Sequence, residues 1–199
     1  MKVKQIKTAV MIFLAIFLSG CASVKKEQLT FNGMIYNDNN EAVGDVSIFL
    51  DDKEIAVTDI YGHFTIIDLK NNNDYVLKAV KKGYETTEIE FTFLNASQVL
   101  YIRMYSAQEL LAKTEKLIAE KKYAEAENTI DRAEKAEASF LSTNYLKAVL
   151  SYNRKDFDKA LSLLQNLIDN EYSESYVYLF MADVYEYGFK NVEETKNCL

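Results

Sequence analysis

The hydrophobic period of this chain changes near residue 106, and this change limits the folds that it can adopt. Before that point apolar residues alternate with polar ones, as Ile89, Phe91 and Phe93 alternate with charged and hydroxyl side chains. Beyond it the chain is rich in Ala, Leu, Glu and Lys, and its apolar residues recur at helical spacing. Alternation is typical of strands with one buried face, and the longer period is typical of amphipathic helices. We therefore expect a β domain followed by an α domain.

Seven segments of the first domain qualify as strands. Turn-forming residues separate them, and short strands arranged in this way are typical of a β-sandwich. In the last segment Leu100, Ile102 and Met104 share one face, opposite Tyr101 and Arg103. We predict a seven-stranded β-sandwich over residues 29–105, built from LTFNGMIY, DVSIFLD, EIAVTD, HFTIIDL, YVLKAVKK, TTEIEFTFL and VLYIRMY.

Part of this domain resembles a known one. The stretches FNGMIYNDNNEAVGDVSIFL, VTDIYGHFTI and NDYVLKAVKKGYE are similar to the carboxypeptidase regulatory-like, transthyretin-type β-sandwich. The proline often found before the second strand of that family is replaced here by Ala42 and Val43. The resemblance implies a domain without an active site. The matching residues, which we interpret as scaffold, are Gly33, Val43, Gly44, Val46, Thr58, Asp59, Gly62, Phe64, Tyr75, Leu77, Gly83 and Tyr84.

One short run of these residues has a direct structural interpretation. It is Thr58-Asp59-x-x-Gly62-x-Phe64. An aspartate can accept hydrogen bonds from the backbone of its own turn, and glycine adopts a positive φ at little cost. We expect Phe64 then to enter the core on the following strand.

The second domain, residues 106–199, repeats with a period of 34 residues, and KKYAEAENTI matches KDFDKALSLL at this spacing. It resembles tetratricopeptide (TPR) repeats, for which this period is typical. About two and a half repeats are present, although the prolines that often end such repeats are absent. We predict an array of α–α helical hairpins after the sandwich. A capping box, Ser106-x-x-Glu109, marks the junction, and the short linker predicts little motion between the domains.

The TPR resemblance implies a concave surface formed by the first helix of each repeat. Tyrosines and aliphatic residues on it suit a protein or peptide partner. Its acids, Glu115, Asp183 and Glu186, favour a partner that carries Lys or Arg. Core packing is the alternative explanation for many of these residues. The candidate partner-binding residues are Leu111, Glu115, Tyr145, Val149, Tyr152, Tyr176, Leu179, Asp183 and Glu186, with Gln108, Ile118 and Ser142 on the same pattern.

The amino terminus reads as an export signal. MKVKQIK carries three lysines, and the nine apolar residues VMIFLAIFL follow. As a helix they would span about 14 Å, short of the ~30 Å hydrocarbon core, so an uncleaved anchor is the weaker interpretation. The run Leu18-Ser19-Gly20-Cys21 resembles the lipobox of bacterial lipoproteins. That resemblance implies a lipid on the Cys21 sulfur and cleavage after Gly20.

The lipobox divides the amino-terminal region into a signal peptide, residues 1–20, and a lipid-anchored tether, residues 21–28. Several acyl chains on one residue exceed what reversible membrane attachment needs. Ala22 and Ser23 stand where an aspartate would favour the inner membrane, so we expect a cell-envelope protein in the outer membrane. A plain secreted protein with an incidental cysteine is the alternative.

Charge and residue types limit the chemistry. Removing residues 1–20 takes the net charge from −7 to −10, which disfavours nucleic acid as a partner. The chain has one histidine, His63, which we expect on the exposed face of a strand, so no Cys/His cluster can hold zinc. If Cys21 is acylated, Cys198 has no intramolecular partner, and we expect an exposed thiol there. We expect neither a cofactor nor catalytic residues.

These observations together predict a noncatalytic, lipid-anchored scaffold that binds another protein through its helical domain. An extracytoplasmic receptor for a glycan or small ligand, using the sandwich loops, is the alternative from a different class. A hydrolase that uses sandwich carboxylates is a third, although no carboxylate spacing singles out a pair.

Overall fold

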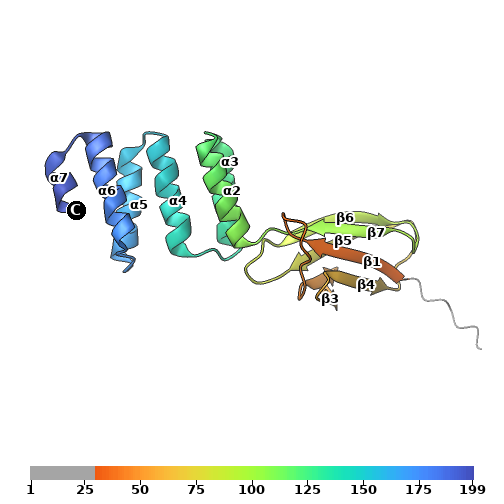
Figure 1. The fold of residues 1–199 in the computed structure, drawn as a ribbon. Helices are drawn as coiled ribbons and strands as arrows, with labels where there is room; N and C mark the ends of the chain where they lie inside the picture. Colours follow the sequence, from red (N-terminus) through yellow and green to blue (C-terminus); the bar gives the residue numbers. More distant parts are fainter. Residues whose placement is uncertain (1–29) are drawn as a thin grey trace, which may run out of the picture.

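The structure is a computed structural model that describes residues 30–199. Two β-sheets lie at one end of the elongated molecule, and helices follow in a row, so that α7 lies far from the start of β1 (Figure 1). The predicted signal peptide, the tether and Cys21 fall outside the described residues. Within residues 30–199, no helix combines the length and apolar character needed to cross a membrane.

The predicted strands are confirmed as two sheets. One has the order β4–β1–β7 and the other β3–β2–β5–β6. β1 pairs in parallel with β7, and the other pairs are antiparallel. Side chains from both sheets, including Phe31, Ile48, Phe93 and Ile102, form one buried core. The strands are β1 (Thr30–Tyr36), β2 (Ser47–Leu50), β3 (Lys53–Val57), β4 (His63–Ile67), β5 (Asn73–Val80), β6 (Thr87–Phe93) and β7 (Val99–Arg103).

The turn before β4 has the structure expected from its sequence. Asp59 Oδ1 accepts hydrogen bonds from the backbone N–H of Tyr61 and of His63, each at 2.9 Å. Gly62 has a φ of 74°, and the Phe64 ring is buried in the core. The Thr58 hydroxyl, also buried, accepts from Val46 N at 2.9 Å and donates to Val43 O at 3.0 Å. These bonds tie the turn to the loop between β1 and β2.

The helices form successive packed pairs, α2 with α3 and α4 with α5. Ala126 and Ala160, one repeat apart in the sequence, are fully buried where the paired helices approach. The last pair differs, because α6 continues into a π-helical segment, η1 (Val184–Phe189), before a short α7. The α-helices are α2 (Ala107–Ala119), α3 (Tyr123–Lys135), α4 (Phe140–Asn153), α5 (Phe157–Asp169), α6 (Ser175–Asp183) and α7 (Val192–Asn197).

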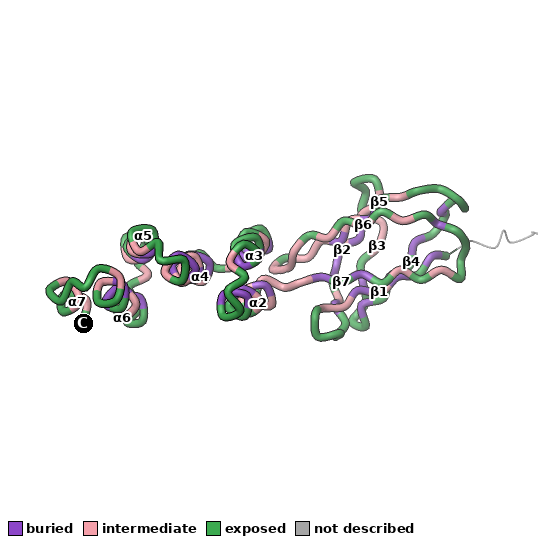
Figure 2. The backbone as a smooth tube through the Cα atoms, turned by 90° about the horizontal axis from the view of Figure 1, so that it is seen from above, coloured by how far each residue is buried: buried purple, intermediate pink, exposed green. Residues whose placement is uncertain are grey.

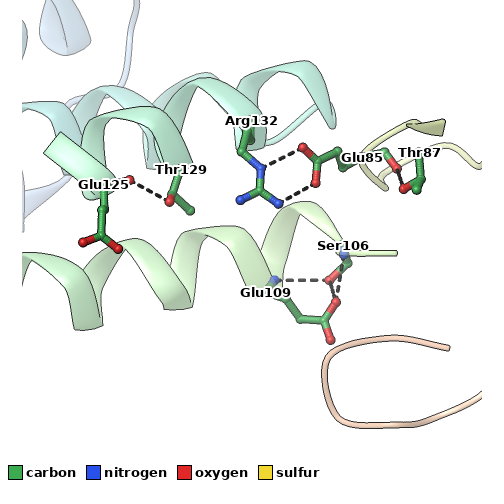
Figure 3. Close-up of polar contacts among 7 residues, drawn as sticks. All are labelled: Glu85, Thr87, Ser106, Glu109, Glu125, Thr129 and Arg132. Atoms are coloured by element: carbon green, nitrogen blue, oxygen red, sulfur yellow. Dashed lines mark hydrogen bonds and ion pairs between the residues drawn. The ribbon is translucent and has the colours of Figure 1, made fainter. Parts of the chain in front are cut away.

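The two domains are joined by a closely bonded junction. The predicted capping box is confirmed: Ser106 Oγ accepts from Glu109 N at 3.2 Å, and Glu109 Oε2 accepts from Ser106 N at 2.8 Å (Figure 3). Arg132 of α3 donates two hydrogen bonds of 2.7 Å to the carboxylate of Glu85, in the loop between β5 and β6. The guanidinium also lies over the Tyr105 ring, 5.3 Å from its centroid. These contacts link the first helical pair directly to the sandwich.

Candidate functional site

A hollow of about 330 Å³ opens between α2, α4 and α6. Seen from above, with the helices end-on, α2 and α6 lie on one side of the helical row, and α3 and α5 lie on the other (Figure 2). The sequence placed six of the residues lining this hollow on one surface, and the structure brings them together there: Gln108, Leu111, Glu115, Ser142, Tyr145 and Tyr176.

Aromatic rings continue this surface along α4 and α6. The Tyr145 ring meets the rings of Tyr176 and Phe180 at centroid distances of 5.2 and 5.6 Å. The Tyr152 ring lies 5.5 Å from that of Phe180 and 5.6 Å from that of Phe157. The hollow therefore leads into a row of packed aromatic side chains. We call the hollow and this aromatic row the groove.

The other predicted site residues separate into exposed and packed ones. Leu179 is 53% exposed, and Asp183 at the end of α6 and Glu186 in η1 are also exposed. Val149 is half-buried against the cluster that joins α2, α3 and α4. Ile118 is only 6% exposed and belongs to that cluster, so it contributes to packing and offers no contact surface.

The charge of Asp183 acts on the groove tyrosines. Burial, followed by the neighbouring Tyr176 and Asp183, raises the pKa of Tyr145. Burial, followed by Asp183 and Tyr187, raises the pKa of Tyr152. Both phenols therefore stay protonated near neutral pH and can donate hydrogen bonds.

Phe180 is a groove residue that the sequence interpretation missed. It contacts both Tyr145 and Tyr152, and it lies four positions after Tyr176 on α6. Residues four apart on a helix share one face, so this spacing was an available signal.

A second hollow, of about 610 Å³, lies at the junction of the two domains. Asp38 and Asn39 from the β1–β2 loop face Glu109, Lys113 and other residues of α2 across it. Glu109 Oε1 is buried there and accepts no hydrogen bond from any described residue. The lining mixes acids and lysines, and Asp38 and Asn39 are the lining residues that come from the sandwich.

Cys198 and His63 lie in different domains, Cys198 directly after α7 and His63 at the start of β4. The Cys198 thiol is partly buried beside Tyr185, where we expected an exposed thiol, because the carboxyl terminus folds back on the last helices. Burial, followed by the charge of Glu194, raises the pKa of this thiol and makes it a weak nucleophile. His63 lies exposed on β4, as predicted, 3.8 Å from Asp59. In residues 30–199 no three His, Cys, Asp or Glu side chains gather closely enough to hold a metal ion.

The chain matches no protein-family model and no curated protein. It is similar to chains in two crystal structures, an N-terminal and a C-terminal interface mutant of a type II cohesin-X-dockerin complex from Acetivibrio cellulolyticus. The identities are 26% and 24%, both with a TM-score of 0.33. Each match covers 39% of this chain, and 57% and 58% of the respective solved chain.

Proposed function

We propose that this protein is a lipid-anchored, noncatalytic scaffold of the bacterial cell envelope that binds a segment of another protein in the groove. The observation that carries this proposal is the meeting of α2, α4 and α6 around the hollow. Exposed tyrosine and leucine side chains, rimmed by acids, form a surface of the kind that protein partners bury. An elongated groove between helices suits an extended or helical peptide segment.

A TPR-like array accounts for this geometry. α2 and α4 begin 33 residues apart, at Ala107 and Phe140, and α3 and α5 begin 34 residues apart, at Tyr123 and Phe157. Stacked hairpins of nearly constant length present their first helices on one surface, where a partner can contact several repeats at once. The α7 hairpin is shorter and would close the array.

The sandwich would then act as a spacer between lipid and groove. The first strand of the sandwich, β1, starts at Thr30, directly after the segment that contains Cys21. The helices follow at the end of the sandwich opposite to the start of β1 (Figure 1). A junction fixed by Arg132 and Glu85 would keep the groove at a constant distance from the membrane. Ala22 and Ser23, which follow Cys21 where an aspartate would favour the inner membrane, support the outer membrane as the place of attachment.

One experiment tests both halves of the proposal. The full-length protein would be produced in its native cells with an alkyne fatty acid and then affinity-purified after chemical crosslinking. We expect Cys21→Ala to lose the fatty-acid label. We expect Tyr176→Ser with Leu179→Ser to lose at least about 90% of a crosslinked partner, because the groove loses its two exposed anchors, 42% and 53% accessible.

The matched control is Tyr101→Ser with Val99→Ser on β7, a tyrosine and an aliphatic residue that are similarly exposed, at 62% and 45%. This control should retain both the label and the partner. Undiminished partner recovery by the groove variant would reject the scaffold function, and a labelled Cys21→Ala protein would reject the anchor.

A further inference from the structure

Three exposed aliphatic side chains lie at the end of the sandwich where β1 begins, opposite to the helices (Figure 1). Ile67 ends β4 and pairs with Thr30, the first residue of β1. Leu94 directly follows β6, Val99 starts β7, and the loop of residues 95–98 joins them. The exposed fractions are 52% for Ile67, 53% for Leu94 and 45% for Val99. We call these three residues the aliphatic patch, and exposed apolar residues that gather in this way mark contact surfaces.

The side chains next to the aliphatic patch are polar but uncharged. The loop between Leu94 and Val99 reads NASQ, and the Gln98 side-chain oxygen accepts a hydrogen bond from Leu94 N at 3.0 Å. On the outer face of the three-stranded sheet, Asn32 pairs with both Thr65 and Val99, and its side-chain oxygen accepts from the Thr65 hydroxyl at 3.0 Å. Such groups can approach lipid headgroups without the cost of moving a charge out of water.

Charged residues at this end lie to one side of the aliphatic patch. Among the described residues they are Asp68, Lys70 and Asp74, in and beside the β4–β5 loop. The acidic β2–β3 turn, residues 51–52, lies further back, because β2 ends level with Leu77 in the interior of β5. An aliphatic surface with few charges around it suits a neutral lipid surface, and the net negative charge of the chain disfavours an anionic one.

The proposed lipid anchor places a bilayer within reach of this end. Residues 22–29 separate Cys21 from Thr30. An extended chain spans at most about 3.3–3.6 Å per residue, so the start of β1 lies no further than about 30 Å from the anchored cysteine. A surface held so close to a bilayer by a covalent link meets it as an intramolecular event, and weak apolar contacts are then sufficient for binding.

We propose that the aliphatic patch docks on the bilayer that holds the anchor, with its three side chains at the boundary between headgroups and acyl chains. Tyr101 lies two positions after Val99, on the same face of β7, and is 62% exposed. Its ring then lies level with the headgroups, where tyrosine is favoured. Docking by this end directs the helical row away from the bilayer. This inference rests on the proposed lipid anchor and adds the orientation of the protein on the membrane.

Fluorescence quenching by labelled lipid tests this orientation. The full-length, lipid-modified protein would carry a bimane label at Ala96→Cys, beside the patch, or at Ile60→Cys, in the turn at the opposite end of the sandwich, each in a Cys198→Ser background. Both positions are exposed. The vesicles would be phosphatidylcholine, part of it with a nitroxide near the headgroup end of an acyl chain. We expect at least about fivefold more quenching at position 96, because only this position lies at the bilayer surface.

Substitutions separate docking from mere proximity to the anchor. Ile67→Ser with Val99→Ser should reduce quenching at position 96 at least about threefold, because the patch loses most of its apolar surface while the anchor remains. The matched control is Ile60→Ser with Tyr61→Ser, two apolar residues at the opposite end of the same domain that are 77% and 63% exposed. This control should leave quenching at position 96 unchanged.

Equal quenching at positions 96 and 60, in a protein that carries the fatty-acid label, overturns the docked orientation and leaves the anchor in place. That result is expected instead if a second copy of the chain covers the patch. Quenching that persists in Ile67→Ser with Val99→Ser also overturns docking by the patch. The comparison of the two positions uses the unsubstituted patch, so it does not depend on the folding of the serine variant. A protein without the fatty-acid label rejects the anchor itself and, with it, the docking that rests on it.

Discussion

Replacing Gly62 by alanine should destabilise the sandwich by about 3 kcal/mol, the sum of left-handed backbone strain and a steric clash. Gly62 has a φ of 74°, and a Cβ atom built there would lie 2.3 Å from the carbonyl oxygen of Ile35. That oxygen accepts a hydrogen bond from Val43 N, and Ile35 N donates to Gly62 O at 2.9 Å. The new methyl group would push β1 away from the turn before β4, which contains Gly62, and from the β1–β2 loop, which contains Val43. Native-state hydrogen exchange of the β1 and β4 amides measures the loss.

Gly83 provides the matched control for this substitution. Its φ is 77°, nearly the same, but no atom lies within 4 Å of a Cβ built there. Gly83→Ala should therefore cost only the backbone strain, about 1 kcal/mol. Equal losses in the two variants would show that the close approach of the turn to Ile35 is not a constraint on the fold.

Replacing Arg132 by methionine should loosen the junction between the domains. Both 2.7 Å hydrogen bonds to Glu85 are lost, and a carboxylate only 24% exposed is left without its partner. Charge-assisted, partly buried bonds of this kind contribute about 1–2 kcal/mol in total. Backbone bonds such as Ala107 N to Gly83 O, at 2.8 Å, remain at the junction and can act as a hinge. We expect a broader range of angles between the sandwich and the helices.

Pulsed electron spin resonance would measure this angle in the full-length protein, with spin labels on Leu94→Cys and Ser162→Cys in a Cys198→Ser background. The distance distribution should be narrow with Arg132 present and broad in Arg132→Met. The control, Lys78→Met, breaks an exposed pair with Glu88 at 3.7 Å, which is worth little. If the distance distribution of Arg132→Met is as narrow as that of the control, the Arg132–Glu85 pair does not set the angle between the domains.

Local sequence patterns predicted much of the fold. Period-two alternation identified the buried faces of β6 and β7, where Phe93 and Ile102 are fully buried. The capping box at Ser106 and the turn at Asp59 were predictable because each depends on residues a few positions apart. Six residues that line the hollow were named in advance because the TPR resemblance implied that they share one surface.

Features that depend on distant residues could not be predicted in this way. Glu85 and Arg132 are 47 positions apart, and only the packing of α3 against the β5–β6 loop brings them together. Ile118 followed the groove pattern, but the approach of α3 and α4 buries it. Within the π-helical segment η1, Gly188 packs so closely on Phe157, 31 positions earlier, that a Cβ built there would lie 2.7 Å from its ring.

Site-specific photo-crosslinking in native cells would show whether the groove holds a protein. The full-length chain would carry a benzophenone amino acid at Leu179 or, as the comparison, at Tyr101 on the sandwich; both positions are exposed. We expect a discrete protein adduct from position 179, lost when Glu115→Gln and Asp183→Asn are added, and no such adduct from position 101. An adduct from position 101 alone, or none from position 179 in a normally processed protein, would contradict a partner-binding groove.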